Sequence, residues 1–79
     1  MREKKGSAQK LAAWTEAARR IAHEIKNPLT PIRLAAERLR ARQRQGGADL
    51  AGLVEPSVDI IVREVTTMQG LVDEFSRYA

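Results

Sequence analysis

The stretch that decides the fold reads His23-Glu24-Ile25-Lys26-Asn27-Pro28-Leu29-Thr30-Pro31-Ile32. It holds the single histidine of the chain and two of its three prolines, in a region whose apolar pattern is otherwise helical. Within a helix, Pro28 cannot donate a hydrogen bond to the carbonyl of Glu24. Pro31 likewise cannot donate to the carbonyl of Asn27, and each interior proline costs about 3 kcal/mol. Two residues that disfavour the surrounding helix, placed this close together, often mark a functional site.

Apolar residues continue at helical spacing on both sides of these prolines. Separated alternately by three and four positions, they are Leu11, Trp14, Ala18, Ile21, Ile25, Pro28, Ile32, Ala35 and Leu39. If the prolines ended one helix and began another, the phase of the pattern should reset, but Ile25, Ile32 and Leu39 keep step. We therefore expect one helix over about residues 8–44, about 55 Å long, with a kink at Pro28–Pro31.

The bounds of this first helix leave alternatives open at both places where the pattern is interrupted. If the prolines break the helix, it ends early and Thr30 caps a new helix that has Pro31 at its first position. At the start of the chain, residues 1–7 contain no apolar residue after Met1. We expect them to be disordered, a linker, or the end of an upstream helix, so that the domain itself covers residues 8–79.

The segment Gln45-Gly46-Gly47-Ala48-Asp49 predicts a turn over residues 45–49. Gly46 or Gly47 can adopt the left-handed position after a helix, and Asp49 can cap the next helix. We expect that second helix over about residues 50–78. Its apolar seam consists of Val54, Val58, Ile61, Val65, Met68, Val72 and Phe75. A further row widens the stripe with Leu50, Leu53, Ile60, Leu71 and Tyr78.

The two stripes match when the chain is folded about the glycines, because residues whose numbers sum to about 93 then lie level. The level pairs include Ile32 with Ile61, Ile25 with Met68, and Ile21 with Val72. The second stripe is wider than one partner helix needs. We therefore predict an all-α fold, an antiparallel two-helix hairpin that dimerises into a four-helix bundle. Its core and dimer seam are assigned to Trp14, Ile21, Ile25, Ile32, Leu39, Ile61, Val65, Met68, Val72 and Phe75.

Length and composition exclude several classes of protein. A chain of 79 residues forms one domain, and without cysteine it has no disulfide or thiolate metal site. One histidine makes a zinc site implausible, so we expect no bound metal. No apolar run reaches about 18 residues, so we expect no contact with a membrane. The lack of cysteine fits the cytoplasm.

The net charge of +4 and the run Arg38, Arg40, Arg42 and Arg44 permit a nucleic-acid partner. Charges of both signs are mixed along the chain, however, and no aromatic residue lies within the run to stack on bases. A solvated helix end, favoured by the helix dipole, explains the arginines more simply. We therefore expect no nucleic-acid partner.

The heptad phase places His23 on the outside of the first helix. With Ile21 at position d and Ile25 at position a, His23 takes the outermost position f, and Glu24 takes position g on the rim. Asn27 lies one turn further on. A neutral imidazole is a good nucleophile near neutral pH, and a carboxylate on one ring nitrogen would leave the other free to attack. The competing interpretation is a solvated surface histidine without function.

The run His23-Glu24-Ile25-Lys26-Asn27-Pro28-Leu29 resembles the H-box of two-component sensor histidine kinases, H-E-[IL]-[RK]-[NT]-P-L. The wider segment 18–39 and the run Val72-Asp73-Glu74-Phe75-Ser76 are similar to nitrogen-regulation sensors of the NtrY type. The resemblance covers the chain from about Leu11. It implies a dimerisation and histidine-phosphotransfer domain, in which His23 accepts the γ-phosphoryl of ATP. By the same resemblance Glu24 is the general base, Asn27 orients phosphate or water, and Pro28 kinks the helix.

The resemblance also implies the partners, which are a second copy of the chain, the ATP-binding domain of the same kinase, and a response-regulator receiver domain. The N, G and F boxes of that ATP-binding domain do not occur in these 79 residues. We therefore expect this chain to bind no cofactor itself and not to autophosphorylate unaided, with ATP and Mg²⁺ entering through the ATP-binding domain. The expected location is the cytoplasmic part of an inner-membrane sensor. The alternative is a structural helical-bundle module without chemistry, which leaves both prolines unexplained.

Overall fold

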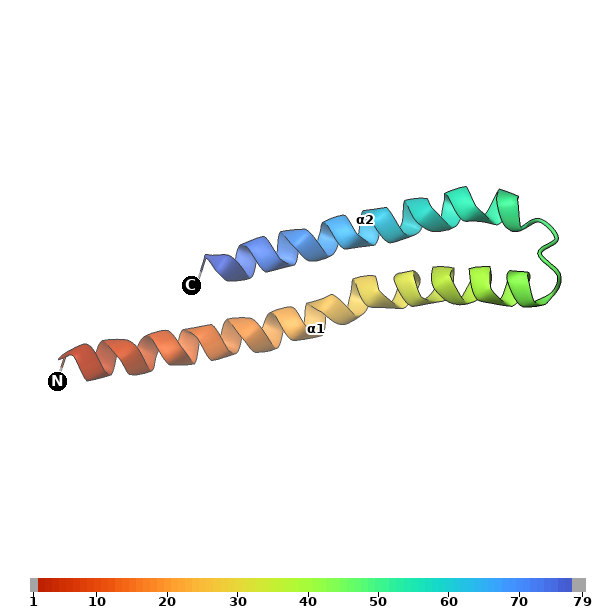
Figure 1. Cartoon of the computed structure of the whole chain (residues 1–79). Helices are drawn as coiled ribbons and strands as arrows, with labels where there is room; N and C mark the ends of the chain where they lie inside the picture. Colours follow the sequence, from red (N-terminus) through yellow and green to blue (C-terminus); the bar gives the residue numbers. More distant parts are fainter. Residues whose placement is uncertain (1, 78–79) are drawn as a thin grey trace.

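The computed structural model describes the backbone of residues 2–77 and the side chains of residues 8–77. Within them lie two α-helices, α1 (Arg2–Arg44) and α2 (Leu50–Ser76). The helices run antiparallel, side by side, and the beginning of α1 extends past the end of α2 (Figure 1). The Cα atoms extend over 67 × 17 × 12 Å. The predicted all-α helical hairpin is confirmed.

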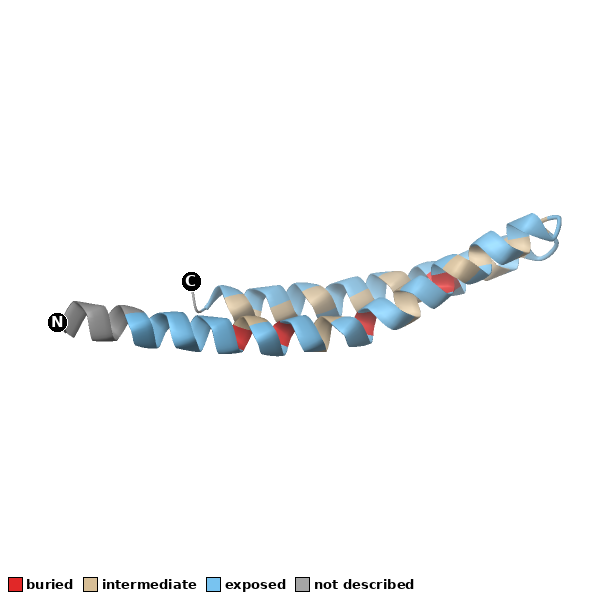
Figure 2. Ribbon diagram, turned by 90° about the horizontal axis from the view of Figure 1, so that it is seen from below, coloured by how far each residue is buried: buried red, intermediate tan, exposed pale blue. Residues whose placement is uncertain are grey.

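Both prolines lie inside α1, which is continuous over 43 residues. The alternative of a break at Thr30 is therefore wrong, because its hydroxyl donates within the helix to the carbonyl of Lys26 at 3.1 Å. Packing explains how the helix persists. Ile21, Pro28 and Ala35 are spaced by seven residues and are all buried, so α2 covers this face of α1 (Figure 2). The predicted kink stays a prediction.

The helices end near the predicted bounds, with one extension. α1 begins at Arg2, before the predicted start, so of the alternatives given for this segment a helix fits the backbone of residues 2–7. Periodicity did not reveal this segment, because it contains no apolar residue and therefore has no apolar face to detect. α2 ends at Ser76, and Tyr78, predicted near its end, lies outside the described residues.

The turn is closed by backbone hydrogen bonds that two glycines make possible. Gly46 and Gly47 have φ angles of 104° and 78°, which confirms the predicted left-handed conformation. The N–H of Gly47 donates to the carbonyl of Arg42 at 3.0 Å, and the N–H of Gly46 donates to that of Gln43 at 3.2 Å. This pair of bonds is the Schellman motif, and it satisfies carbonyls that the end of a helix leaves without donors.

The prediction that Asp49 caps α2 is wrong. Asp49 itself is left-handed, with φ 62° and ψ 10°, and forms no side-chain hydrogen bond to the helix. A capping side chain reaches the first N–H groups from a residue in the extended region, and the left-handed backbone turns it away. The carboxylate of Asp49 lies instead 3.7 Å from Nη1 of Arg42. An ion pair thus joins the end of α1 to the turn.

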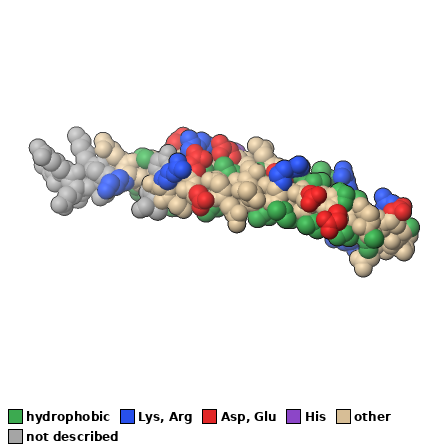
Figure 3. Space-filling model, turned by 90° about the horizontal axis from the view of Figure 1, so that it is seen from above, with side chains coloured by type: hydrophobic (Ala, Val, Ile, Leu, Met, Phe, Trp, Pro, Cys, Tyr) green, Lys and Arg blue, Asp and Glu red, His purple; other side chains and the backbone are tan. Residues whose placement is uncertain are grey.

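The apolar stripe of α2 divides into two rows. One row, half-buried against α1, consists of Leu50, Leu53, Ile60, Ile61, Met68, Leu71 and Phe75. The other, which we name the valine row, is exposed and consists of Val54, Val58, Val62, Val65 and Val72. Val72 is 53 % exposed although it lies level with the buried Ile21. Apolar side chains gather along one edge of the surface that α2 forms (Figure 3). One partner helix therefore covers only one of the two rows.

Two glycine substitutions should change stability in opposite directions. Gly46→Ala places a Cβ at φ 104° and should lower the free energy of unfolding by about 1–2 kcal/mol. Gly70→Ala, inside α2 with no atom within 4 Å of the added Cβ, should raise it by about 1 kcal/mol. Urea unfolding followed by circular dichroism measures both. An unchanged midpoint for Gly46→Ala would contradict the left-handed turn.

Candidate functional site

His23 lies on the exposed outer side of α1, and this position follows from the packing of the helix. Pro28 is buried against α2, and His23 precedes it by five residues, which is about 140° around a helix axis. The imidazole therefore points away from the helix contact. An exposed nitrogen nucleophile can be reached by other proteins without opening the hairpin.

The structure places the other predicted site residues within one turn of His23. Glu24 is half-buried, on the side of α1 that approaches α2, and Asn27 is exposed one turn later. Among residues 8–77, no hydrogen bond or ion pair joins His23, Glu24 or Asn27 to another side chain. All three side chains are thus available to a bound partner. Pro31, like Pro28, remains within the helix that carries them.

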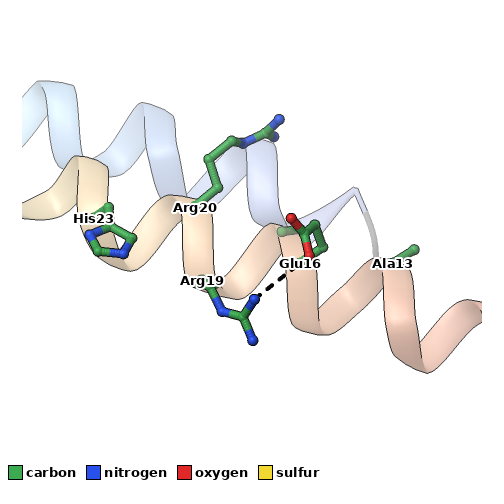
Figure 4. Close-up of a pocket in the computed structure, with 6 residues that line it drawn as sticks. Ala13, Glu16, Arg19, Arg20 and His23 are labelled. Atoms are coloured by element: carbon green, nitrogen blue, oxygen red, sulfur yellow. Dashed lines mark ion pairs between the residues drawn. The ribbon is translucent and has the colours of Figure 1, made fainter.

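An open pocket of about 490 Å³, which we name the His23 pocket, lies on the N-terminal side of His23 (Figure 4). Its lining residues are Ala13, Glu16, Ala17, Arg19, Arg20 and His23. The two arginine side chains leave α1 in different directions, and Arg19 lies 3.9 Å from Glu16 on the same helix. Guanidinium groups beside a nucleophile suit an anionic substrate.

Arg20 reaches across to α2, where its Nη2 donates to Oε1 of Glu74 at 3.2 Å. Beside this pair, the rings of Trp14 and Phe75 lie 5.2 Å apart between centroids, at 53°. The sequence analysis did not single out Arg20 or Glu74. Two signals could have found them. Arg20 precedes His23 by one helical turn, and the residue numbers of Arg20 and Glu74 sum close to 93, which places them level on the two helices.

Two features are absent from the residues that the structure describes. Neither helix contains an apolar stretch of the length and composition that crossing a membrane requires. Within the same residues, histidine, cysteine, aspartate and glutamate side chains form no group of three or more that could hold a metal ion.

Residues 13–79 match the family described as His Kinase A (phospho-acceptor) domain. The chain belongs to this family. Nitrogen regulation protein NtrY of Azorhizobium caulinodans is 48% identical over 73 residues, which are 92% of this chain and 10% of that protein. Two proteins described as putative sensor histidine kinase NtrY-like, from Rickettsia typhi and Rickettsia prowazekii, are 40% and 39% identical over 72 residues. These residues cover 91% of this chain and 12% of each protein.

The chain thus spans about a tenth of the length of the curated relatives it matches. No solved structure matches it with comparable significance. The sequence-based assignment to this family, with its resemblance to NtrY-type sensors, is confirmed. The description of this family names a phospho-acceptor domain, and the chain contains a single histidine.

Replacing Pro31 should stabilise this His Kinase A domain. Pro31→Ala restores an N–H that can donate to the carbonyl of Asn27, and Pro31 is only half-buried, so little packing is lost. We expect the free energy of unfolding to rise by about 1–3 kcal/mol. Thermal unfolding followed by circular dichroism measures the change, with Ala36→Ser, an exposed position on the same helix, as the control. A lowered melting temperature would show that the proline stabilises the fold.

Proposed function

We propose that this chain is the dimerisation and phosphoacceptor domain of a sensor histidine kinase. In this proposal His23 accepts the γ-phosphoryl of ATP from a separate ATP-binding domain and passes it to an aspartate of a response regulator. The observation that carries the proposal is the exposure of the single histidine within the run from His23 to Leu29. A residue that two different protein domains must contact in turn has to be exposed to solvent. A purely structural bundle does not require an exposed histidine.

The transfer requires one bond to form and one to break. The unprotonated ring nitrogen of His23 attacks the γ-phosphorus of ATP, a nitrogen–phosphorus bond forms, and the bridging oxygen leaves with ADP. The proton on the other ring nitrogen then passes to a base. Glu24 is the proposed base, because it adjoins His23 in sequence and no ion pair holds it among the described residues.

The second transfer uses the same exposed position. A carboxylate oxygen of the receiver aspartate attacks the phosphorus, the nitrogen–phosphorus bond breaks, and its electron pair returns to the ring, which regains a proton from solvent to become neutral imidazole. Asn27 lies one turn beyond His23 on the exposed side of α1. Its amide can donate to phosphate or orient a water molecule, so we assign it to dephosphorylation of the regulator.

ATP and Mg²⁺ belong in this proposal to the ATP-binding domain, and this chain contributes only the acceptor side chains. The parent protein is accordingly proposed to be a membrane-bound sensor whose phosphotransfer domain lies in the cytoplasm. The names of the relatives support the sensor histidine kinase part of this proposal, and this chain covers 10% and 12% of their length.

The valine row supports a homodimer that forms a four-helix bundle. A pocket of about 320 Å³ opens on this row and is lined by Val65, Met68, Gln69, Val72 and Asp73. On α1, Leu11 and Leu29 are also exposed, and helical periodicity places them on the same side of the hairpin as the valine row. A second hairpin laid against this side would bury both sets of apolar residues.

The first prediction of this proposal concerns the acceptor. His23→Gln should reduce label from γ-labelled ATP to background when the chain is mixed with the ATP-binding domain of an NtrY-type kinase, because the amide is not a nucleophile. The bound label should be acid-labile and base-stable, as a phosphoramidate is. Lys26→Gln, exposed on the next turn, is the matched control and should retain labelling. Equal labelling of the His23 variant would refute the assignment.

The second prediction concerns the dimer. Val65→Asp puts a charge into the valine row and should weaken association at least about 100-fold, since burying an unpaired carboxylate is costly. Thr66→Asp adds the same charge one position away, on the side of α2 that faces solvent, and should leave the dimer intact. Sedimentation equilibrium measures both variants. A dimer that survives Val65→Asp would place the interface elsewhere.

A further inference from the structure

The ion pair between Arg20 and Glu74 joins α1 to α2 beside the predicted acceptor. Its atoms lie 3.2 Å apart, and the two side chains are 52% and 45% exposed. Among residues 8–77, the other ion pairs lie within one helix or between α1 and the turn. Pairs this exposed typically contribute about 0–1 kcal/mol, so a stronger anion can displace the carboxylate.

Arg20 and His23 line the same pocket and are three residues apart on one helix (Figure 4). Residues with this spacing are neighbours on a helix surface. Helical side chains also lean toward the N-terminus, so the His23 ring covers the turn that contains Arg20. A phosphoryl group bonded to that ring would therefore lie within reach of the guanidinium.

We propose that Arg20 exchanges Glu74 for the phosphoryl group on His23, and that phosphorylation thereby breaks the ion pair between the helices. The inference rests on His23 being the acceptor. A phosphoryl group carries a charge of about −1.5 to −2 and three acceptor oxygens, against a single negative charge on the carboxylate. The planar guanidinium can bind two of those oxygens at once. Arg20 is thus a positioning residue for the phosphoryl group.

Arg19 lines the same pocket but has a different consequence. Its partner Glu16 lies on α1 itself, so release of that pair leaves the contact between the helices unchanged. Glu74, in contrast, immediately precedes Phe75, whose ring packs on Trp14. Since Trp14 is the single tryptophan of the chain, its fluorescence reports on this end of the helix contact.

The test needs no kinase, because phosphoramidate is a small phosphoryl donor to imidazole. The ring nitrogen of His23 attacks phosphorus, the phosphorus–nitrogen bond of the donor breaks, ammonia leaves, and the ring proton passes to solvent. The rate of phosphorylation is followed by mass spectrometry and Trp14 fluorescence in parallel. The variants are Arg20→Gln, Arg20→Lys, Glu74→Gln and the double variant, with Arg33→Gln as a control for net charge.

The exchange predicts effects of opposite sign. Glu74→Gln frees Arg20 and should speed phosphorylation by about twofold to fivefold, whereas Arg20→Gln should slow it by about fivefold. The double variant should match Arg20→Gln, Arg20→Lys should recover part of the rate, and Arg33→Gln should match the unaltered chain. Phosphorylation should change Trp14 fluorescence in the unaltered chain and not in Arg20→Gln.

Two other results would overturn the inference and are distinguishable. If His23 is phosphorylated but both single variants change the rate in the same direction, or not at all, the ion pair is merely structural and the proposed function stands. If neither phosphoramidate nor a kinase domain with ATP places a phosphoryl group on His23, the proposed function fails and the exchange fails with it.

Discussion

The structure depends on the spacing of seven residues that puts Ile21, Pro28 and Ala35 into the contact with α2. A proline inside a solvated helix removes a hydrogen bond and tends to end the helix. Here the ring of Pro28 is buried, and apolar burial at about 25 cal/mol per Å² offsets part of that loss. The same burial turns His23 to the opposite, exposed side. One packing constraint therefore both preserves the helix and presents the nucleophile.

A single hairpin leaves part of the apolar surface of α2 exposed to solvent. Among the described residues, the buried apolar side chains are Ala17, Ile21, Pro28 and Ala35, while the valine row stays exposed. Short chains seldom gain enough stability from such a core alone. Helical periodicity places His23 on the side of α1 away from the valine row, so the proposed dimer would cover the valines and leave the histidine open to other proteins.

Periodicity predicted the helices and the outward position of His23, because both depend on the phase of the apolar pattern, and the glycine turn between the two stripes predicted the hairpin. It could not divide the stripe of α2, since phase does not say which of two adjacent apolar rows meets α1. The conformation of Asp49 was mispredicted because residue type favours a cap, whereas the geometry of the turn sets its φ of 62°. Predicting the ion pair between Arg20 and Glu74 requires the register between the two helices. Pairing residues whose numbers sum to about 93 gives that register only approximately.

The contacts around His23 fall into two layers that respond differently to charge. Beneath it, the seam of Ile21 and Pro28 is apolar, and added charge at the surface changes its burial little. Outside it, exposed ion pairs such as the one between Arg20 and Glu74 contribute on the order of 1 kcal/mol each. A phosphoryl group on His23 would therefore act on the outer layer and spare the seam. Because Arg20 alone links that layer across to α2 among the described ion pairs, the effect would reach α2 at Glu74 without unfolding the hairpin.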